Sequence, residues 1–212
     1  MLYRVPALLL SLMMHELSHA FAAYMCGDQT AKKAGRISFN PLRHLDPIGA
    51  IMLIVTRFGW AKPVPINPGN FRNKKAGIII TSIAGPLSNV LLAIIFNAVS
   101  IIFEVKTAPP PRLPLTDGVR AAQIIIDQFV LINISLAAFN LIPIPPLDGS
   151  KVLFSLLPDR IYYNYILRYE RYGMFILMAL SISGYLLVIL GPILNFISSV
   201  IAKTSFLVLP FI

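Results

Sequence analysis

The chain has 212 residues, of which 57% are hydrophobic and only 13% charged, and its formal net charge is +9. A soluble domain of this size has too little interior for so much apolar surface, so the composition indicates an integral membrane protein and excludes a disordered chain or a coiled coil. The single cysteine, Cys26, excludes an internal disulfide. The positive charge does not indicate nucleic-acid binding, because no basic stripe is interleaved with aromatic residues.

Four apolar stretches are long enough to cross a hydrocarbon core, which takes about 20 helical residues. They cover residues 2–26, 76–104, 121–142 and 174–202. The fourth stretch contains Gly184, Gly191 and Pro192, residue types at which a helix kinks or breaks. We therefore expect an α-helical membrane protein with about four transmembrane helices, folded as a single polytopic domain over residues 1–212.

The segment between the first two spans is not a spanning helix. Residues 47–55 form an apolar run of nine, too short to cross a membrane, and Gly59, Trp60 and a series of prolines follow. Such a segment is tolerated at membrane depth only where protein or water covers it. We expect residues 36–70 to form a small membrane-associated β-hairpin or sheet, or a re-entrant loop.

Loop charge predicts the orientation of the chain. Residues 28–75 and 148–173 hold thirteen of the 18 Lys and Arg residues, and with four spans both loops lie on the same side of the membrane. Cytoplasmic loops collect Lys and Arg, so we expect both loops in the cytoplasm and the N-terminus outside. The aromatic residues expected to anchor the chain at the membrane interface are Trp60, Tyr162, Tyr163 and Tyr165.

The first span carries the sequence His15-Glu16-Leu17-Ser18-His19. Histidines at positions i and i+4 lie on one helical face, so both imidazoles can reach one metal ion, and Glu16 beside them is placed to accept a proton from water. This is the H-E-x-x-H arrangement of zinc metallopeptidases. Chance and a signal peptide are weaker explanations, because hydrocarbon strongly penalises an unpaired Glu and two His.

A catalytic zinc ion takes three protein ligands, so the motif predicts one more. Asp148 is the best candidate, because it follows the third span where prolines break the helix, and a carboxylate inside a bundle needs a cationic partner. An ordinary Asp-Gly turn is the alternative. His44 lies in a basic, proline-flanked loop, where we expect it to face water or cap a turn.

The second span has one face of small and polar residues. Such residues permit close helix packing and hydrogen bonds between helices, so a structural role is the favoured interpretation. The residues of this face are Ser82, Gly85, Asn89, Ala93 and Asn97. Asn133 and Asn140 share a face of the third span in the same way.

Taken together, the motifs resemble the site-2 protease family, the zinc intramembrane metalloproteases, in its short prokaryotic form without PDZ or CBS domains. The pieces that carry the resemblance are H-E-L-S-H in the first span, N-L-I-P-I-P-P-L-D-G after the third, G-W-A-K-P-V-P at 59–65 and A-G-P-L-S-N at 84–89.

This resemblance implies that His15, His19 and Asp148 bind one Zn²⁺ ion per chain and that Glu16 is the general base. It also implies that Asn140 helps to hold the substrate strand, and we group Asn89 with it as a supporting residue. The implied activity is hydrolysis of peptide bonds in or near transmembrane segments of membrane-protein substrates, in a prokaryotic cell membrane.

Three other functions remain open at this stage. A membrane-anchored peptidase with a cytoplasmic active site would use Glu as its third ligand, with the motif helix outside the lipid. A small transporter or metal-binding membrane protein would bind metal without hydrolysis. A structural membrane subunit would bind no stoichiometric zinc. The sequence does not predict an oligomeric state.

Overall fold

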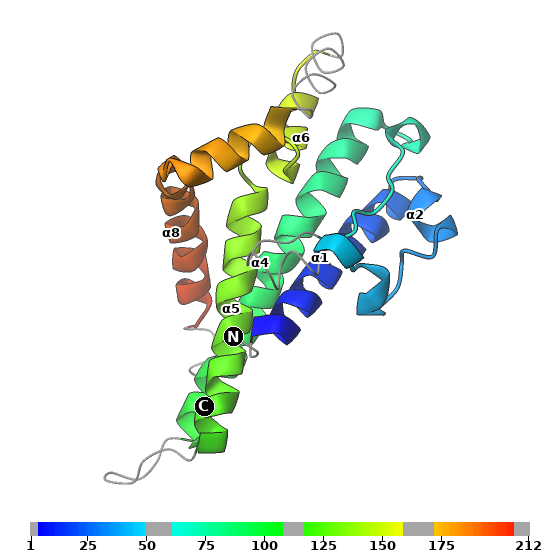
Figure 1. Cartoon of the computed structure of the whole chain (residues 1–212). Coiled ribbons are helices and arrows are strands. Elements are labelled where there is room, and N and C mark those ends of the chain that lie inside the picture. Colours follow the sequence, from blue (N-terminus) through cyan, green and yellow to red (C-terminus); the bar gives the residue numbers. More distant parts are fainter. Residues whose placement is uncertain (1–3, 50–60, 108–116, 159–171, 206–212) are drawn as a thin grey trace.

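The computed structural model describes residues 4–49, 61–107, 117–158 and 172–205, and these residues are arranged as helices and connecting loops (Figure 1). Four helices are long and apolar enough to cross a membrane, which confirms that part of the prediction. They are α1 (Arg4–Met25), α4 (Lys74–Thr107), α5 (Asp117–Asn140) and α8 (Tyr185–Ser205). The connections contain the short helices α2 (Thr30–Lys33) and α6 (Asp148–Ser155) and the 3₁₀ turns η1 (Pro41–Arg43) and η2 (Pro68–Asn70).

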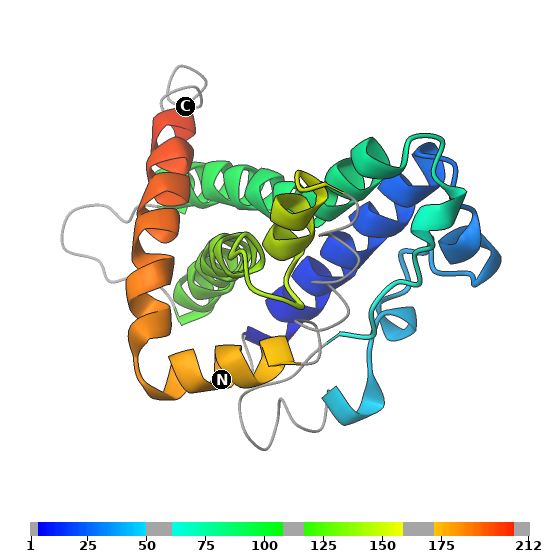
Figure 2. The same ribbon diagram turned by 90° about the horizontal axis from the view of Figure 1, so that it is seen from above.

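Helix α4 packs against α1, α5, α6 and α8, and seen from above it runs along one side of the bundle (Figure 2). Small side chains let the helix backbones approach closely. A buried cluster between α4, α5 and α8 consists of Ala93, Ala137, Ala138, Ile197 and Ile201. Of the face predicted on the second span, Ser82, Gly85, Asn89 and Ala93 are buried. The burial of these four residues supports the expected packing role, and Asn97, the fifth residue of the face, is half-buried.

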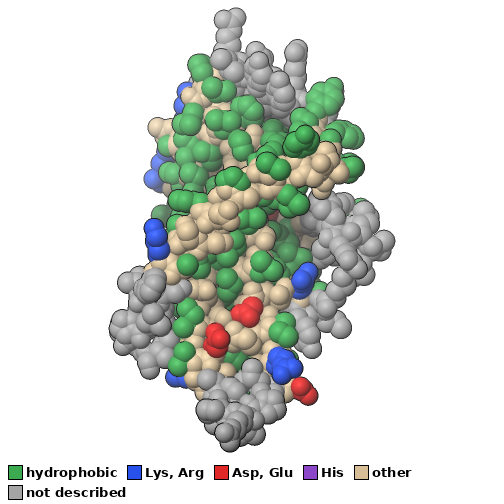
Figure 3. Space-filling model, turned by 90° about the vertical axis from the view of Figure 1, so that its left-hand side faces the viewer, with side chains coloured by type: hydrophobic (Ala, Val, Ile, Leu, Met, Phe, Trp, Pro, Cys, Tyr) green, Lys and Arg blue, Asp and Glu red, His purple; other side chains and the backbone are tan. Residues whose placement is uncertain are grey.

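The outward faces of the long helices are apolar. Leu87, Leu91 and Ile95 of α4 are each more than 50% exposed, and large apolar side chains of α8 are exposed as well. On the face shown in Figure 3, hydrophobic side chains outnumber charged ones among the described residues, and charged side chains lie at the edges and the lower end. Apolar surface of this extent is what a hydrocarbon environment accommodates and water does not.

The fourth predicted span, 174–202, is divided into two helices, as its glycines and proline led us to expect. A shorter apolar helix, Tyr172–Ile182, lies across one end of the bundle and is followed by α8 (Figure 1). The break falls at Gly184, whose φ of +79° is a conformation that glycine adopts without steric cost. Gly191 and Pro192, the other expected break points, lie within α8.

The segment predicted as a β-hairpin or sheet contains no strand in its described parts, residues 36–49 and 61–70. An isolated antiparallel bridge joins Leu45 to Ala61, and the Lys62 N–H donates to the His44 carbonyl oxygen at 2.9 Å. Prolines follow the bridge and supply no N–H to extend a ladder. Residues 50–60, with Trp60, lie outside the described residues, as do Tyr162, Tyr163 and Tyr165.

Asp28 fastens this connection to the end of α1. Its carboxylate is fully buried. Oδ1 accepts hydrogen bonds from the Thr30 N–H at 3.0 Å and from Asn70 Nδ2 at 2.8 Å, and Oδ2 accepts one from the Asn67 N–H at 2.7 Å. The chain that returns toward α4 is thereby held against α1, close to the residues of the H-E-x-x-H motif.

Candidate metal centre

His15 and His19 lie one turn apart on the buried face of α1. Their ring centroids are 4.6 Å apart with planes at 87°, and their Nε2 atoms are 3.0 Å apart. Only 4% of His15 and 6% of His19 is exposed. The prediction that both imidazoles reach a common point from one helical face is confirmed.

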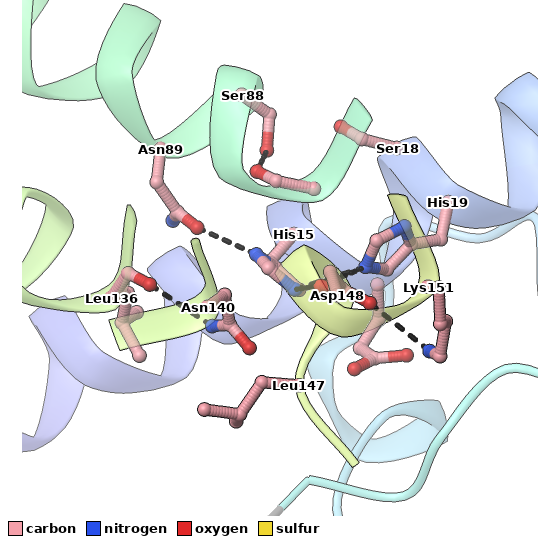
Figure 4. Close-up of polar contacts among 12 residues, drawn as sticks. His15, Ser18, His19, Ser88, Asn89, Leu136, Asn140, Leu147, Asp148 and Lys151 are labelled. Atoms are coloured by element: carbon pink, nitrogen blue, oxygen red, sulfur yellow. Dashed lines mark hydrogen bonds and ion pairs between the residues drawn. The ribbon is translucent and has the colours of Figure 1, made fainter. Parts of the chain in front are cut away.

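Asp148, the first residue of α6, completes the cluster. Its Oδ2 atom lies 3.2 Å from His15 Nε2 and 3.0 Å from His19 Nε2 (Figure 4). The other oxygen, Oδ1, is 3.1 Å from Lys151 Nζ. The chain can turn back here because Gly149 has no side chain, since a Cβ would lie 2.7 Å from the Ile142 carbonyl oxygen.

Hydrogen bonds behind the two rings decide which nitrogens face the cluster. His15 Nδ1 is 2.6 Å from Asn89 Oδ1, and His19 Nδ1 is 2.7 Å from the Thr81 carbonyl oxygen. Both partners are acceptors, so both Nδ1 atoms carry the proton and both Nε2 atoms present lone pairs.

Two imidazole lone pairs and a carboxylate oxygen therefore face one another in a buried space, with all three candidate ligand atoms within 4.8 Å. Such an arrangement is unfavourable unless a cation compensates it. Two histidines and a carboxylate, each imidazole held from behind by an acceptor, form a donor set suited to zinc. These residues fit the ion that the sequence predicts.

Glu16 is half-buried and lies beside the cluster. Its Oε2 atom accepts a hydrogen bond from the Val64 N–H at 3.0 Å. The Val64 side chain packs with Ala20 of α1 and with Ala31. The segment around Val64 thus positions the carboxylate of Glu16, a relationship that sequence reasoning missed because any residue except proline supplies a backbone N–H.

The other predicted residues divide into those near the cluster and those away from it. Asn89 is fully buried and bonded to His15. Asn140 is half-buried, and its Nδ2 donates to the Leu136 carbonyl oxygen at 3.0 Å (Figure 4). His44 lies outside the candidate ligand group. It is the C-cap of η1, which confirms the expectation that it caps a turn, but it is only 2% exposed, so the alternative that it faces water is wrong.

Four candidate spans around two buried histidines of an H-E-x-x-H motif and a buried aspartate define a multi-pass membrane metallopeptidase. The model of peptidase family M50 matches residues 117–184. The protein "Putative zinc metalloprotease YwhC" of Bacillus subtilis is 37% identical over 197 residues, which is 91% of this chain and 86% of that protein. The chain belongs to peptidase family M50, the site-2 protease family of zinc metalloproteases.

Relatives that match a smaller part of the chain carry similar names. "Putative zinc metalloprotease Rip2" of Mycolicibacterium smegmatis is 28% identical over 68% of this chain and 53% of that protein. "Putative zinc metalloprotease MJ0611" of Methanocaldococcus jannaschii is 40% identical over 34% of this chain and 31% of that protein. No solved structure matches the chain significantly.

Proposed function

We propose that this zinc metalloprotease acts within the membrane, hydrolysing peptide bonds in or near transmembrane segments of membrane-protein substrates. The observation that carries the proposal is the convergence of His15 Nε2, His19 Nε2 and Asp148 Oδ2 in a buried space between helices long enough to span a bilayer. A peptidase that acted outside the lipid would have no need to build its site on such helices.

In this proposal, His15, His19 and Asp148 hold one zinc ion per chain. Bound zinc supplies a Lewis acid that polarises a carbonyl group and activates water. Lys151 neutralises the second oxygen of Asp148, so the carboxylate presents a single oxygen to the histidines. The third ligand is then an aspartate, not the glutamate that a peptidase with its site outside the lipid is expected to use.

Glu16 is the general base and acid of the reaction. It takes a proton from the attacking water, whose oxygen bonds to the scissile carbonyl carbon, and it delivers that proton to the amide nitrogen as the C–N bond breaks. The Val64 N–H donates a hydrogen bond to Oε2 of Glu16, and this bond holds the carboxylate in place for the proton transfer.

The substrate must present an extended backbone, because a helix hides its carbonyl groups in internal hydrogen bonds. A transmembrane substrate therefore has to unwind locally. In this proposal Asn140 helps to hold the unwound strand, and the strand pairs with the segment 50–66, of which residues 50–60 lie outside the described residues. Deletion of that segment with full retention of cleavage would remove the pairing step.

The proposal places the basic loops 28–75 and 148–173 in the cytoplasm of a prokaryotic cell and the N-terminus outside. Two features support it. The positive-inside rule assigns the basic side to the cytoplasm. In addition, α2 and α6, which belong to the two loops, lie at the same end of the bundle (Figure 1).

The test compares wild type with Glu16→Gln, purified in detergent, for zinc content and for cleavage of a peptide that contains a transmembrane segment. We expect both proteins to bind one zinc ion and only the wild type to cleave. If Glu16→Gln cleaves at the wild-type rate, Glu16 is not the general base. If the wild type cleaves only soluble peptides, the proposed hydrolysis is retained, but the proposal that its substrates are transmembrane segments is wrong.

A further inference from the structure

A buried chain of hydrogen bonds runs from α5 through α4 to His15 of α1. Asn133 Nδ2 donates to the Phe129 carbonyl oxygen and to Ser11 Oγ, both at 2.8 Å. Asn89 Nδ2 donates to Asn133 Oδ1 at 2.8 Å and to the Ser11 carbonyl oxygen at 3.3 Å. Asn89 Oδ1 in turn faces His15 Nδ1 at 2.6 Å.

The donor-to-acceptor direction of these hydrogen bonds is set by a main-chain atom, the Phe129 carbonyl oxygen. The Phe129 carbonyl can only accept, so it fixes the Asn133 amide with Nδ2 toward Phe129 and Ser11 and with Oδ1 toward Asn89. Oδ1 of Asn133 then fixes the Asn89 amide, so that its oxygen points to His15. An amide flip at either asparagine would set two donors or two acceptors against each other.

The chain is sealed from solvent at every side chain. Ser11, Asn89 and Asn133 each have 0% exposed surface. Leaving an amide group without its hydrogen-bond partner in such a buried place is costly. Polar side chains of this kind hold membrane helices together and also set their relative rotation.

From this arrangement we infer that Asn133, together with Ser11, is a positioning residue for the metal centre: it acts through Asn89 to hold the His15 ring with its Nε2 lone pair facing His19 and Asp148. This inference rests on the proposed role of His15 as a zinc ligand. Helix α5 provides none of the three candidate ligands, and under this inference it still contributes to zinc affinity. Partners behind a metal ligand typically affect metal affinity by about 10–100-fold.

The experiment is a double-mutant cycle read out as zinc affinity. Asn89→Ala, Asn133→Ala and the double variant are purified as full-length chains in detergent and titrated with zinc against a chromophoric chelator. We expect Asn89→Ala to weaken zinc binding by about 10–100-fold and Asn133→Ala by roughly tenfold. Because Asn133 acts through Asn89, the double variant should bind zinc as Asn89→Ala alone does.

Two further variants separate positioning from folding. Ser11→Ala removes only the Ser11 Oγ acceptor, and Asn133 keeps its hydrogen bond to the Phe129 carbonyl oxygen. Combined with Asn89→Ala in a second double-mutant cycle, it should disturb Asn133 less than Asn133→Ala does, and we expect zinc affinity to fall by about threefold. Ser135→Ala is the matched control. Ser135 lies on α5, the helix of Asn133, but it is exposed, and its hydroxyl donates to the Leu131 carbonyl oxygen of its own helix. It should bind zinc as the wild type does.

The visible absorption of the cobalt-substituted protein gives a second readout, which should change for Asn133→Ala and not for Ser135→Ala. Wild-type zinc affinity in both Asn133→Ala and Ser11→Ala would overturn the inference, and so would losses that simply add in the double variants. A wild-type protein that binds no zinc would instead overturn the proposed function, so the two failures are distinguishable.

Discussion

Gly85 of α4 lies directly against the ring of His19. A Cβ at Gly85 would collide with Nε2 of His19 and would lie 2.7 Å from Cε1 of His15. Glycine is therefore required here by the close approach of a helix to the candidate ligand atoms, not by its own backbone conformation. At Gly85 the backbone of α4 packs directly on the two histidine rings. Thr81, one turn earlier in α4, accepts a hydrogen bond from His19 Nδ1 through its carbonyl oxygen.

Gly85→Ala should abolish tight zinc binding while leaving the helix intact. The added methyl group displaces the imidazole rings, so we expect zinc affinity to fall by more than about tenfold, although alanine favours a helix by about 1 kcal/mol over glycine. Chelator competition measures the affinity. Gly191→Ala in α8 is the matched control, because nothing lies within 4 Å of its added Cβ. Equal zinc affinity in both variants would contradict this reading of the packing.

Lys151→Met should weaken zinc binding because it removes the positive charge beside Asp148. The Lys151 ammonium neutralises Oδ1 of Asp148 at 3.1 Å, and this leaves Oδ2 for the histidines. Losing a charged hydrogen bond to a buried carboxylate should cost about 1.5–3 kcal/mol, which we expect to appear as a roughly tenfold or greater loss of zinc affinity.

Lys151→Arg keeps the charge and should retain most of that affinity. The two variants are compared in the same titration. If Lys151→Met binds zinc as tightly as Lys151→Arg, the ion pair does not orient Asp148, and the single-oxygen arrangement must come from the α6 backbone alone.

Asp28 predicts an acid-sensitive contribution to stability. Burial alone would raise the pKa of its carboxyl group, but hydrogen bonds from Asn70, Thr30 and Asn67 outweigh burial and hold the pKa below its ordinary value. A carboxyl group whose pKa is lower in the folded state stabilises the fold above its unfolded pKa of about 3.9 and loses that contribution as the pH falls through the folded pKa.

We therefore expect the thermal midpoint of the wild type in detergent to fall as the pH is lowered from 5 toward 3. Asp28→Asn, which replaces one acceptor oxygen by a donor, should melt at a lower temperature at pH 7, by roughly 2–4 °C per kcal/mol lost. It should also show a smaller change between pH 5 and pH 3. Circular dichroism follows the melting, and a variant with the full wild-type pH dependence would exclude Asp28 as its source.

The orientation of the chain is tested by cysteine accessibility. In a Cys26→Ala background, Lys33→Cys and Lys106→Cys place single thiols at opposite ends of the bundle, at positions that are exposed in the structure. A membrane-impermeant thiol reagent should label Lys106→Cys in intact cells and Lys33→Cys only after permeabilisation. The reverse pattern would place the basic loops outside.

The sequence alone predicted the part of the site that depends on local spacing. Two histidines four residues apart must share a helix face, and an aspartate beside broken apolar helices needs a positive partner, so His15, His19 and Asp148 could be named together. The structure confirms that the three side chains converge, since their candidate ligand atoms lie within 4.8 Å of one another.

The remainder depends on tertiary contacts that leave no local signal. The Thr81 carbonyl and the Val64 N–H are backbone groups, which no residue type marks, and the side-chain partners of Asn133 lie on other helices. Gly184 was one of three positions at which we expected the fourth span to kink or break, and the sequence pattern did not show which of the three it would be. The predicted hairpin or sheet contains no strand in its described residues, which form only the isolated Leu45–Ala61 bridge.

The central claim, that His15, His19 and Asp148 hold zinc between membrane-spanning helices, is tested most directly by zinc X-ray absorption on the purified protein, with Asp148→Ala beside the wild type. We expect the wild-type spectrum to show two imidazole ligands with oxygen and no sulfur, and we expect Asp148→Ala to lose the zinc or to change its oxygen ligation. A third imidazole, sulfur ligation, or an Asp148→Ala spectrum identical to that of the wild type would contradict the claim.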